Sequence, residues 1–188
     1  YNYISIVYVP SSSVSLYKSV AGWQSLPIST DELVSVNNAT AGALAATLTT
    51  SGYQLSSISK LKISGNLNSV DFEQIKNNMP LIMELDLSEA SLTGNALPNY
   101  ALYGKNILTS VKLPPSIESI GESAFSLCTD LSEILPLPSS LKTIGYSAFS
   151  KCKSLIGDLV IPTTVTSIGD YAFDGCSGLN GKLTLPLN

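Results

Sequence analysis

The chain has 188 residues, a formal net charge of −4 and a hydrophobic fraction of 44%, which is typical of an ordered protein. All 10 basic residues are lysines and histidine is absent, which excludes Ser-His-Asp catalysis, Cys-His catalysis and imidazole metal sites. An acidic chain without arginine is a poor nucleic-acid binder, and no apolar run is long enough for a membrane-spanning helix.

The first 28 residues differ from the rest of the chain. Residues 4–10 follow the pattern of a strand, and residues 11–21 predict a short helix that precedes Gly22-Trp23. The chain opens without Met or a basic segment, so this is not a signal peptide. We therefore expect the sequence to be an excerpt of a longer gene product. Residues 29–38 are expected to form a linker.

A helical cap and a row of strands are expected next. Residues 39–57 predict an N-terminal cap, in which a helix over 39–49 places Leu44 and Leu48 on one face. A second short helix is expected with Ser69 as its N-cap. Six apolar pairs mark six half-buried strands: Leu61/Ile63, Leu85/Leu87, Val111/Leu113, Leu135/Leu137, Leu159/Ile161 and Leu183/Leu185.

A repeat organises the second half of the chain. Segments that begin at Ile117, Leu141 and Val165 align without a gap at a spacing of 24 residues. They share the pattern I-G-x-x-A-F-x-x-C-x-x-L, followed by L-x-[LI]-P. Because one strand cannot bury its apolar side alone, this period predicts a stack of coils around a continuous core, with the strands in one parallel sheet in chain order. The glycine of the pattern is expected where φ is positive.

These motifs resemble the BspA-like leucine-rich repeats of bacterial surface proteins, of the type found in gut anaerobes. The segment A-G-A-L-A-A at residues 41–46 is similar to their N-terminal cap, and the match covers most of residues 39–188. The resemblance implies an α/β fold: a right-handed leucine-rich-repeat solenoid with one parallel β-sheet, about six 24-residue coils and an N-terminal helical cap. Since Y-V-P-x-x-S-V-x-x-Y-K-x-x-x-G-W resembles the segment that closes such arrays, the expected parts are the closing segment of a preceding array (1–28), a linker (29–38), the cap (39–57) and an array truncated at its C-terminal end (58–188).

The cysteines and phenylalanines of the repeat recur at equivalent positions in adjacent coils. Cys128, Cys152 and Cys176 lie one period apart, within the Cα separation that a disulfide allows. Three interpretations stay open: a buried column of small apolar thiols, one disulfide between neighbours, or a metal site that lacks a fourth ligand. Structural repeat positions are also expected at Phe125, Phe149 and Phe173.

The outward strand positions are the candidate binding face. Glu84 and Asp86 could form an acid/base pair, but Lys60 and Lys62 precede them by one period, which favours a ladder of surface ion pairs. Tyrosines on the return loops, Tyr100, Tyr103, Tyr146 and Tyr171, are either contact aromatics or a cover for the core. Asn38 opens a formal glycosylation sequon. The candidate binding face comprises Lys60, Lys62, Glu84, Asp86, Lys112, Asp158 and Lys182.

The function expected from these features is non-catalytic binding. Five S-x-x-K matches occur in a Ser-rich chain, and none is accompanied by the further motifs of the penicillin-binding class. We expect no enzyme activity and no cofactor, and the resemblance implies an extracellular or cell-surface module that contacts a protein or a glycan. The alternatives are a structural spacer for an adjoining domain, or an accessory module of a larger enzyme. The apolar strand Leu183–Leu187 predicts weak head-to-tail self-association.

Overall fold

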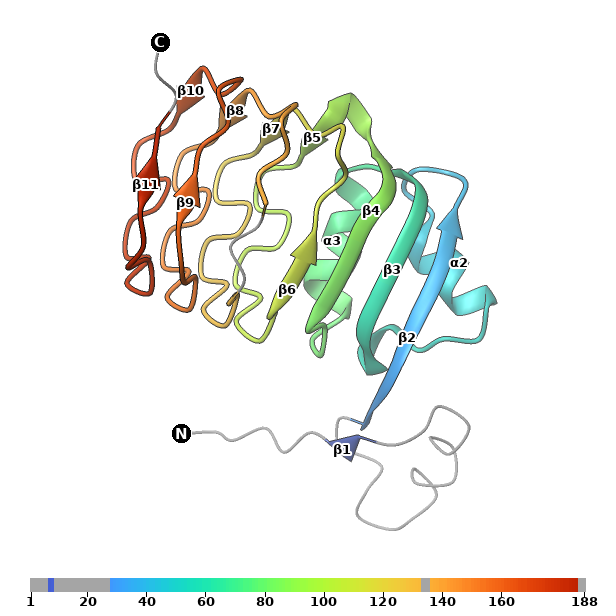
Figure 1. Cartoon of the computed structure of the whole chain (residues 1–188). Helices are drawn as coiled ribbons and strands as arrows, with labels where there is room; N and C mark the ends of the chain where they lie inside the picture. Colours follow the sequence, from blue (N-terminus) through green and yellow to red (C-terminus); the bar gives the residue numbers. More distant parts are fainter. Residues whose placement is uncertain (1–6, 9–27, 133–135, 186–188) are drawn as a thin grey trace.

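The computed structural model describes residues 7–8, 28–132 and 136–185. The chain winds into a stack of coils, and the longer strands lie side by side along one side of the stack (Figure 1). All pairings in this sheet are parallel, and Leu85 is in register with Leu61 on one side and with Val111 on the other. The sheet has the order β1 (Val7–Tyr8), β2 (Ile28–Asn38), β3 (Ile58–Leu67), β4 (Glu84–Leu92), β6 (Ser110–Lys112).

The α/β solenoid of parallel strands is confirmed, but its strands divide among several sheets within the described residues. Each later coil has two short extended segments, so it pairs with its neighbours on two sides. The Ile of each I-G motif lies in a strand of a second, separate sheet. That sheet has the order β10 (Ser167–Ile168), β8 (Thr143–Ile144), β7 (Ser119–Ile120), β5 (Ala96–Leu97), and a further pair joins β9 (Leu159–Val160) and β11 (Leu183–Thr184).

The linker expected over residues 29–38 is wrong, because these residues belong to β2. Val34 pairs with Leu61, and Val36 pairs with Ile63, so β2 continues the sheet by one strand. Val34 is buried and Val36 half-buried, as expected of a strand with one face on the core. Apart from Val7–Tyr8, which pairs with the start of β2, the predicted closing segment lies outside the described residues.

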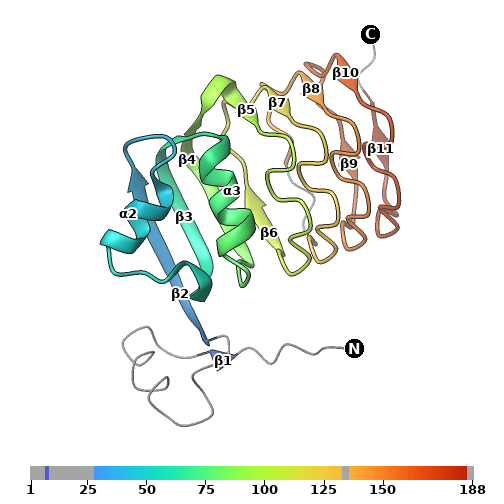
Figure 2. The same cartoon turned by 180° about the vertical axis from the view of Figure 1, so that it is seen from behind.

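Two helices cover the inner face of this sheet at its N-terminal end (Figure 2). Helix α2 (Leu44–Thr50) begins five residues later than the predicted start at residue 39. Asn68, not Ser69, is the N-cap of α3 (Ser69–Asn78), because its side chain accepts a hydrogen bond from the Val70 N–H at 2.9 Å. Short 3₁₀ turns, η2 (Leu55–Ser57) and η3 (Thr93–Asn95), complete the regular elements.

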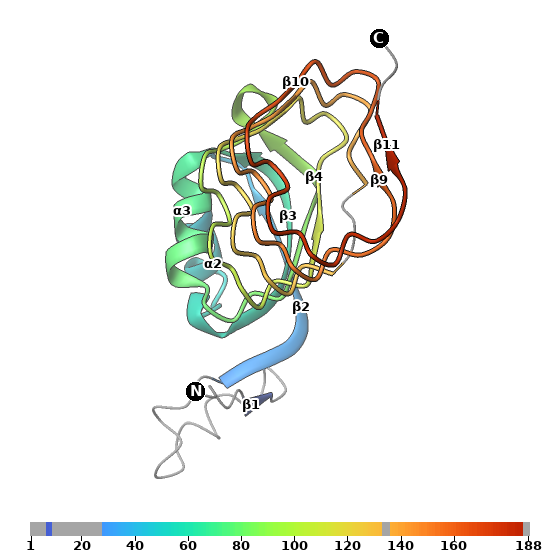
Figure 3. The same cartoon turned by 90° about the vertical axis from the view of Figure 1, so that its left-hand side faces the viewer.

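The coils enclose one continuous apolar core, and Figure 3 looks along the stack, with the coils lying one behind another. The phenylalanines of the repeat lie one above the other: the ring centroids of Phe125 and Phe149 are 4.9 Å apart, and those of Phe149 and Phe173 are 5.2 Å apart. Their planes are nearly parallel, at 5° and 3°. Near-parallel rings at these centroid distances fit the offset stacking that aromatic pairs prefer, so the coil spacing and the ring contacts are compatible.

The expected positive φ at the repeat glycine is wrong. Gly121, Gly145 and Gly169 are not among the residues with a positive φ. Glycine is needed there because the preceding coil approaches closely. A Cβ added to Gly145 would lie 2.7 Å from the Glu122 nitrogen, and one added to Gly169 would lie 2.4 Å from the Tyr146 nitrogen. Because glycine has no side chain, neighbouring coils can stack this closely.

Candidate binding surface

A row of charged side chains crosses the outward face of β3, β4 and β6. Lys60 Nζ lies 3.3 Å from Glu84 Oε1, and Lys112 Nζ lies 3.1 Å from Asp86 Oδ2. Lys62 pairs with Glu89 at 2.6 Å instead of with Asp86, which is its register partner. The register shift between Lys62 and Ser64 explains the change, because it places Glu89 opposite Ser64, on the same side as Lys62.

The carboxylate of Asp86 is held in its ionised form. Partial burial acts to raise its pKa, but the hydrogen bonds from the Ser88 hydroxyl at 2.6 Å and the Ser88 N–H at 3.0 Å, together with Lys112, lower the pKa of Asp86 below its usual value. A general acid would need the opposite shift. The arrangement therefore fits a charged recognition surface better than the acid/base pair considered for Glu84 and Asp86.

An exposed leucine stands beside this charged row. Leu33 on β2 is 53% exposed. It lines a shallow depression of about 100 Å³ with Leu61, Glu84, Leu85, Asp86, Ser110 and Lys112. An apolar centre with a polar rim is the usual anatomy of a protein interface. Leu33 is not among the predicted residues, because residues 29–38 are expected to form a linker, although Val34 and Val36 alternate with polar residues as in a half-buried strand.

The remaining two members of the predicted face lie elsewhere. Asp158 and Lys182 flank the β9–β11 pair, which among the described residues is not paired with the β1–β6 sheet. Their contact is a hydrogen bond from the Lys182 backbone N–H to Asp158 Oδ1 at 2.7 Å. The structure therefore brings five predicted residues together, Lys60, Lys62, Glu84, Asp86 and Lys112, and leaves Asp158 and Lys182 apart.

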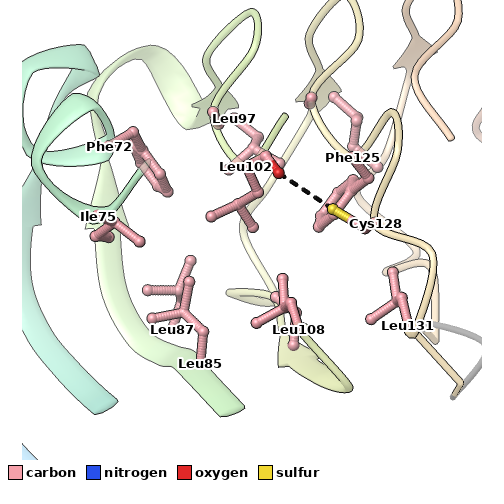
Figure 4. Close-up of a cluster of buried hydrophobic side chains, with 14 of the residues drawn as sticks. Phe72, Ile75, Leu85, Leu87, Leu97, Leu102, Leu108, Phe125, Cys128 and Leu131 are labelled. Atoms are coloured by element: carbon pink, nitrogen blue, oxygen red, sulfur yellow. Dashed lines mark hydrogen bonds between the residues drawn. The ribbon is translucent and has the colours of Figure 1, made fainter. Parts of the chain in front are cut away.

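The three cysteines are free and form a buried row inside the coils. Each thiol donates to a carbonyl of the preceding coil: Cys128 to Leu102 at 3.1 Å (Figure 4), Cys152 to Phe125 at 3.1 Å and Cys176 to Phe149 at 3.0 Å. Burial raises the pKa of Cys128 to about 12 and also raises the pKa of Cys152 and Cys176. These thiols are placed as packing and hydrogen-bonding groups.

Three further features bear on binding chemistry. Asn38 of the formal sequon is fully buried, and its side chain donates to the Asn66 carbonyl at 2.7 Å, so it is closed to glycosylation in the folded chain. Within the described ranges, no group of three or more His, Cys, Asp or Glu residues is placed to hold a metal ion. No helix in the described part of the chain is long and apolar enough to span a membrane.

Comparison with known proteins identifies the class to which these features belong. The chain belongs to the family described as "BspA type Leucine rich repeat region", whose repeat matches residues 95–188 in six copies. Leucine-rich-repeat proteins are generally non-enzymatic, protein-binding modules, and those of the BspA type are typically surface or secreted proteins.

Two solved structures are similar to the chain. A leucine-rich repeat protein from Bacteroides ovatus has 25% identity and a TM-score of 0.56, over 78% of this chain and 36% of that one. The Treponema protein titled "T. pallidum Leucine Rich Repeat protein (TpLRR)" has 24% identity and a TM-score of 0.42, over 93% of this chain and 56% of that one. The chain thus spans about half, or less, of the length of these proteins. No curated protein matches it.

Proposed function

We propose that the protein is a surface or secreted binding module that contacts a partner protein through the outward face of the β2–β3–β4–β6 sheet. The observation that carries this proposal is the exposed Leu33 beside a row of paired charges on adjacent strands. Leu33 supplies an apolar anchor that becomes buried on contact. The charged row supplies a rim that selects the partner by electrostatic complementarity.

Strand spacing supports this assignment of roles. Charges on β3, β4 and β6 recur at the separation of paired strands, roughly 4.8 Å, and signs alternate from Lys60 to Glu84 and from Asp86 to Lys112. Each exposed pair contributes only about 0–1 kcal/mol to stability, so the ladder has little value for folding. Its pattern of alternating signs is better suited to discriminating between partners.

An array of purified extracellular proteins and glycans, probed with the folded chain, tests the proposal. A protein bound by the wild type should lose about tenfold or more in affinity with Leu33→Asp, and similarly with Glu84→Lys. Val70→Asp is the matched control, because Val70 is 45% exposed on α3, away from this face. Absence of any protein ligand would favour the spacer interpretation, and a ligand that tolerates both variants would place the contact elsewhere.

The expected self-association remains a prediction. A pocket of about 390 Å³ lies at the C-terminal end of the described coils, and Leu183 and Leu185, both more than half exposed, line it. Burial of this apolar end against a second copy of the chain would remove it from water. Sedimentation over a wide concentration range should show weak association of the 188-residue chain that Leu183→Glu abolishes; a monomer at every concentration would contradict this.

A further inference from the structure

A second exposed surface runs along the return side of the coils, which is the side seen in Figure 2. In each coil, two residues directly precede the buried alanine of the repeat. Backbone hydrogen bonds join these two positions to the same positions in the next coil. The Tyr100 N–H donates to the Glu122 carbonyl at 2.8 Å, and the N–H groups of Ser123 and Ser147 donate to the carbonyls of Tyr146 and Asp170, each at 2.9 Å. The paired positions are Asn99-Tyr100, Glu122-Ser123, Tyr146-Ser147 and Asp170-Tyr171.

Aromatic rings project from this row into solvent. Tyr100 is 42% exposed, Tyr146 50% and Tyr171 62%. The rings of Tyr146 and Tyr171 meet edge to face with centroids 5.7 Å apart, and Tyr100 meets Tyr103 in the same way at 5.8 Å. The sequence left open whether these tyrosines cover the core, and their exposure shows that they do not. We call Tyr100, Tyr103, Glu122, Tyr146, Asp170 and Tyr171 the tyrosine ridge.

The backbone of the ridge disfavours tyrosine. The second position of each pair is left-handed in all four coils, with φ of 57° at Tyr100, 51° at Ser123, 50° at Ser147 and 58° at Tyr171. A bulky residue is uncommon in this conformation. Two coils use serine at the same place, so the stacking of coils does not require an aromatic side chain. The stacking of coils therefore does not require tyrosine at positions 100 and 171, and their exposed rings are placed for contact with another molecule.

The charge of the ridge indicates what it contacts. Glu122 and Asp170 contribute carboxylates between and beside the rings, and the eight paired positions contain no lysine. The Tyr100 hydroxyl donates to the Glu122 carboxylate, so ring and carboxylate already lie together. A guanidinium group stacks on aromatic faces and binds carboxylates through two parallel hydrogen bonds. A neutral sugar would gain from the rings but not from the charges.

We propose that the tyrosine ridge binds an arginine-bearing segment of a partner protein. This surface is separate from the charged row on β3, β4 and β6, so it provides a second contact and does not depend on the first. Successive coils present an aromatic or acidic side chain at each step of roughly 4.8 Å, so the ridge offers several such groups in a row to a segment that carries more than one arginine.

Calorimetric titration with synthetic peptides tests this proposal on the whole chain. The probe is a peptide of alternating glycine and arginine, compared with the same peptide in which citrulline, an uncharged isostere, replaces arginine. We expect the arginine peptide to bind about tenfold more tightly or better. The double variant Glu122→Gln/Asp170→Asn, and separately Tyr171→Ser, should each reduce this affinity about tenfold.

Matched controls separate the ridge from general attraction to an acidic chain. Glu32→Gln/Glu73→Gln removes the same charge from exposed residues outside the ridge, and Tyr53→Ser removes a tyrosine that is 36% exposed elsewhere. Both should retain the wild-type affinity, as should Leu33→Asp of the strand face. Tyr171→Ser should fold normally, because serine occupies the equivalent position in two other coils.

Three results would overturn the proposal. The first is equal affinity for the arginine and citrulline peptides, or no binding of either. The second is an equal loss in the ridge and control variants, which would mean that only net charge matters. The third is binding of a neutral oligosaccharide, with an affinity that Tyr171→Ser reduces, while the arginine peptide does not bind. The ridge would then be a glycan site.

Discussion

At the scale of single residues, Asp71 is the buried carboxylate that joins the cap to the first coils. Its Oδ2 accepts hydrogen bonds from the N–H groups of Gly42 at 2.6 Å and Asn68 at 2.9 Å. Its Oδ1 accepts from the Leu44 N–H at 2.9 Å and from Asn38 Nδ2 at 3.4 Å. The Asp71 side chain thus accepts hydrogen bonds from backbone N–H groups at the starts of both α2 and α3, which have no partner within the helix.

The variant Asp71→Asn is expected to destabilise the fold strongly. The amide keeps the shape but replaces one acceptor with a donor that faces other donors, so buried N–H groups lose their partners. We expect the free energy of unfolding to fall by about 3 kcal/mol, measured by urea denaturation. Glu73→Gln, an exposed change on the same helix, should stay within about 0.5 kcal/mol of the wild type. Equal effects of the two variants would refute this role.

Lys105 is the buried cation of the chain's middle coils. It is 6% exposed, and its Nζ donates to the carbonyl of Met79, the C-cap of α3, at 2.7 Å. Burial lowers its pKa from 10.5 to about 8. The Lys105 side chain thus provides a hydrogen-bond donor for a carbonyl at the C-terminal end of a helix. The helix dipole favours a positive charge at this end, whereas removal of the ammonium group from water disfavours that charge.

This depressed pKa predicts a rise in stability with pH. Between pH 8 and about 10.5, the folded chain has released the Lys105 proton while the unfolded chain retains it, so the free energy of unfolding increases with pH. Subtracting the values for Lys105→Met from those for the wild type should isolate this increase. The same subtraction for Lys151→Met, a change at an exposed lysine, is the matched control. If the difference in unfolding free energy between the wild type and Lys105→Met did not change with pH, the inference would be contradicted.

At the scale of elements, the 24-residue period predicted what depends on register. It placed Leu61 and Leu85, which are 24 residues apart, on neighbouring strands, and the recurring apolar pair placed Val111 on the next strand although that coil is two residues longer. It did not predict β2, because the sequence of β2 is not a copy of the repeat; pairing with β3 identifies it as a strand. Nor did it predict Glu89 as the partner of Lys62, because a local register shift leaves no trace in the period.

Close contact between coils, and not backbone freedom, is expected to control the effect of changing Gly145. In Gly145→Ala the added Cβ would lie 2.7 Å from the backbone of Glu122, so neighbouring coils must separate, and we expect a loss of about 2 kcal/mol in unfolding free energy. Gly52→Ala isolates the other mechanism, since Gly52 has a φ of +87° and open space around it; its loss should be nearer 1 kcal/mol. A smaller loss at Gly145 than at Gly52 would be inconsistent with this reading of the repeat glycine.

At the scale of the whole molecule, burial falls toward the C-terminal end of the described coils. The Ile of the I-G motif is 0% exposed at Ile120, 1% at Ile144 and 42% at Ile168. In a solenoid each coil is stabilised by its immediate neighbours, so the end coil has fewer contacts to lose when it opens. Local opening should therefore begin in the coil that contains Ile168 and reach the inner coils at higher free energy.

The three thiols can report this order directly. Cys176 is 9% exposed, whereas Cys128 and Cys152 are 0% exposed, and burial raises the pKa of all three, so each must be uncovered before it reacts. In native protein at pH 8, a thiol reagent followed by peptide mapping should modify Cys176 first, at least about tenfold faster than the other two. In urea the three rates should converge, which shows that burial and not intrinsic chemistry sets the order. Equal native rates, or modification of Cys128 before Cys176, would mean that the coils open together, as a single cooperative unit and not from the end inward.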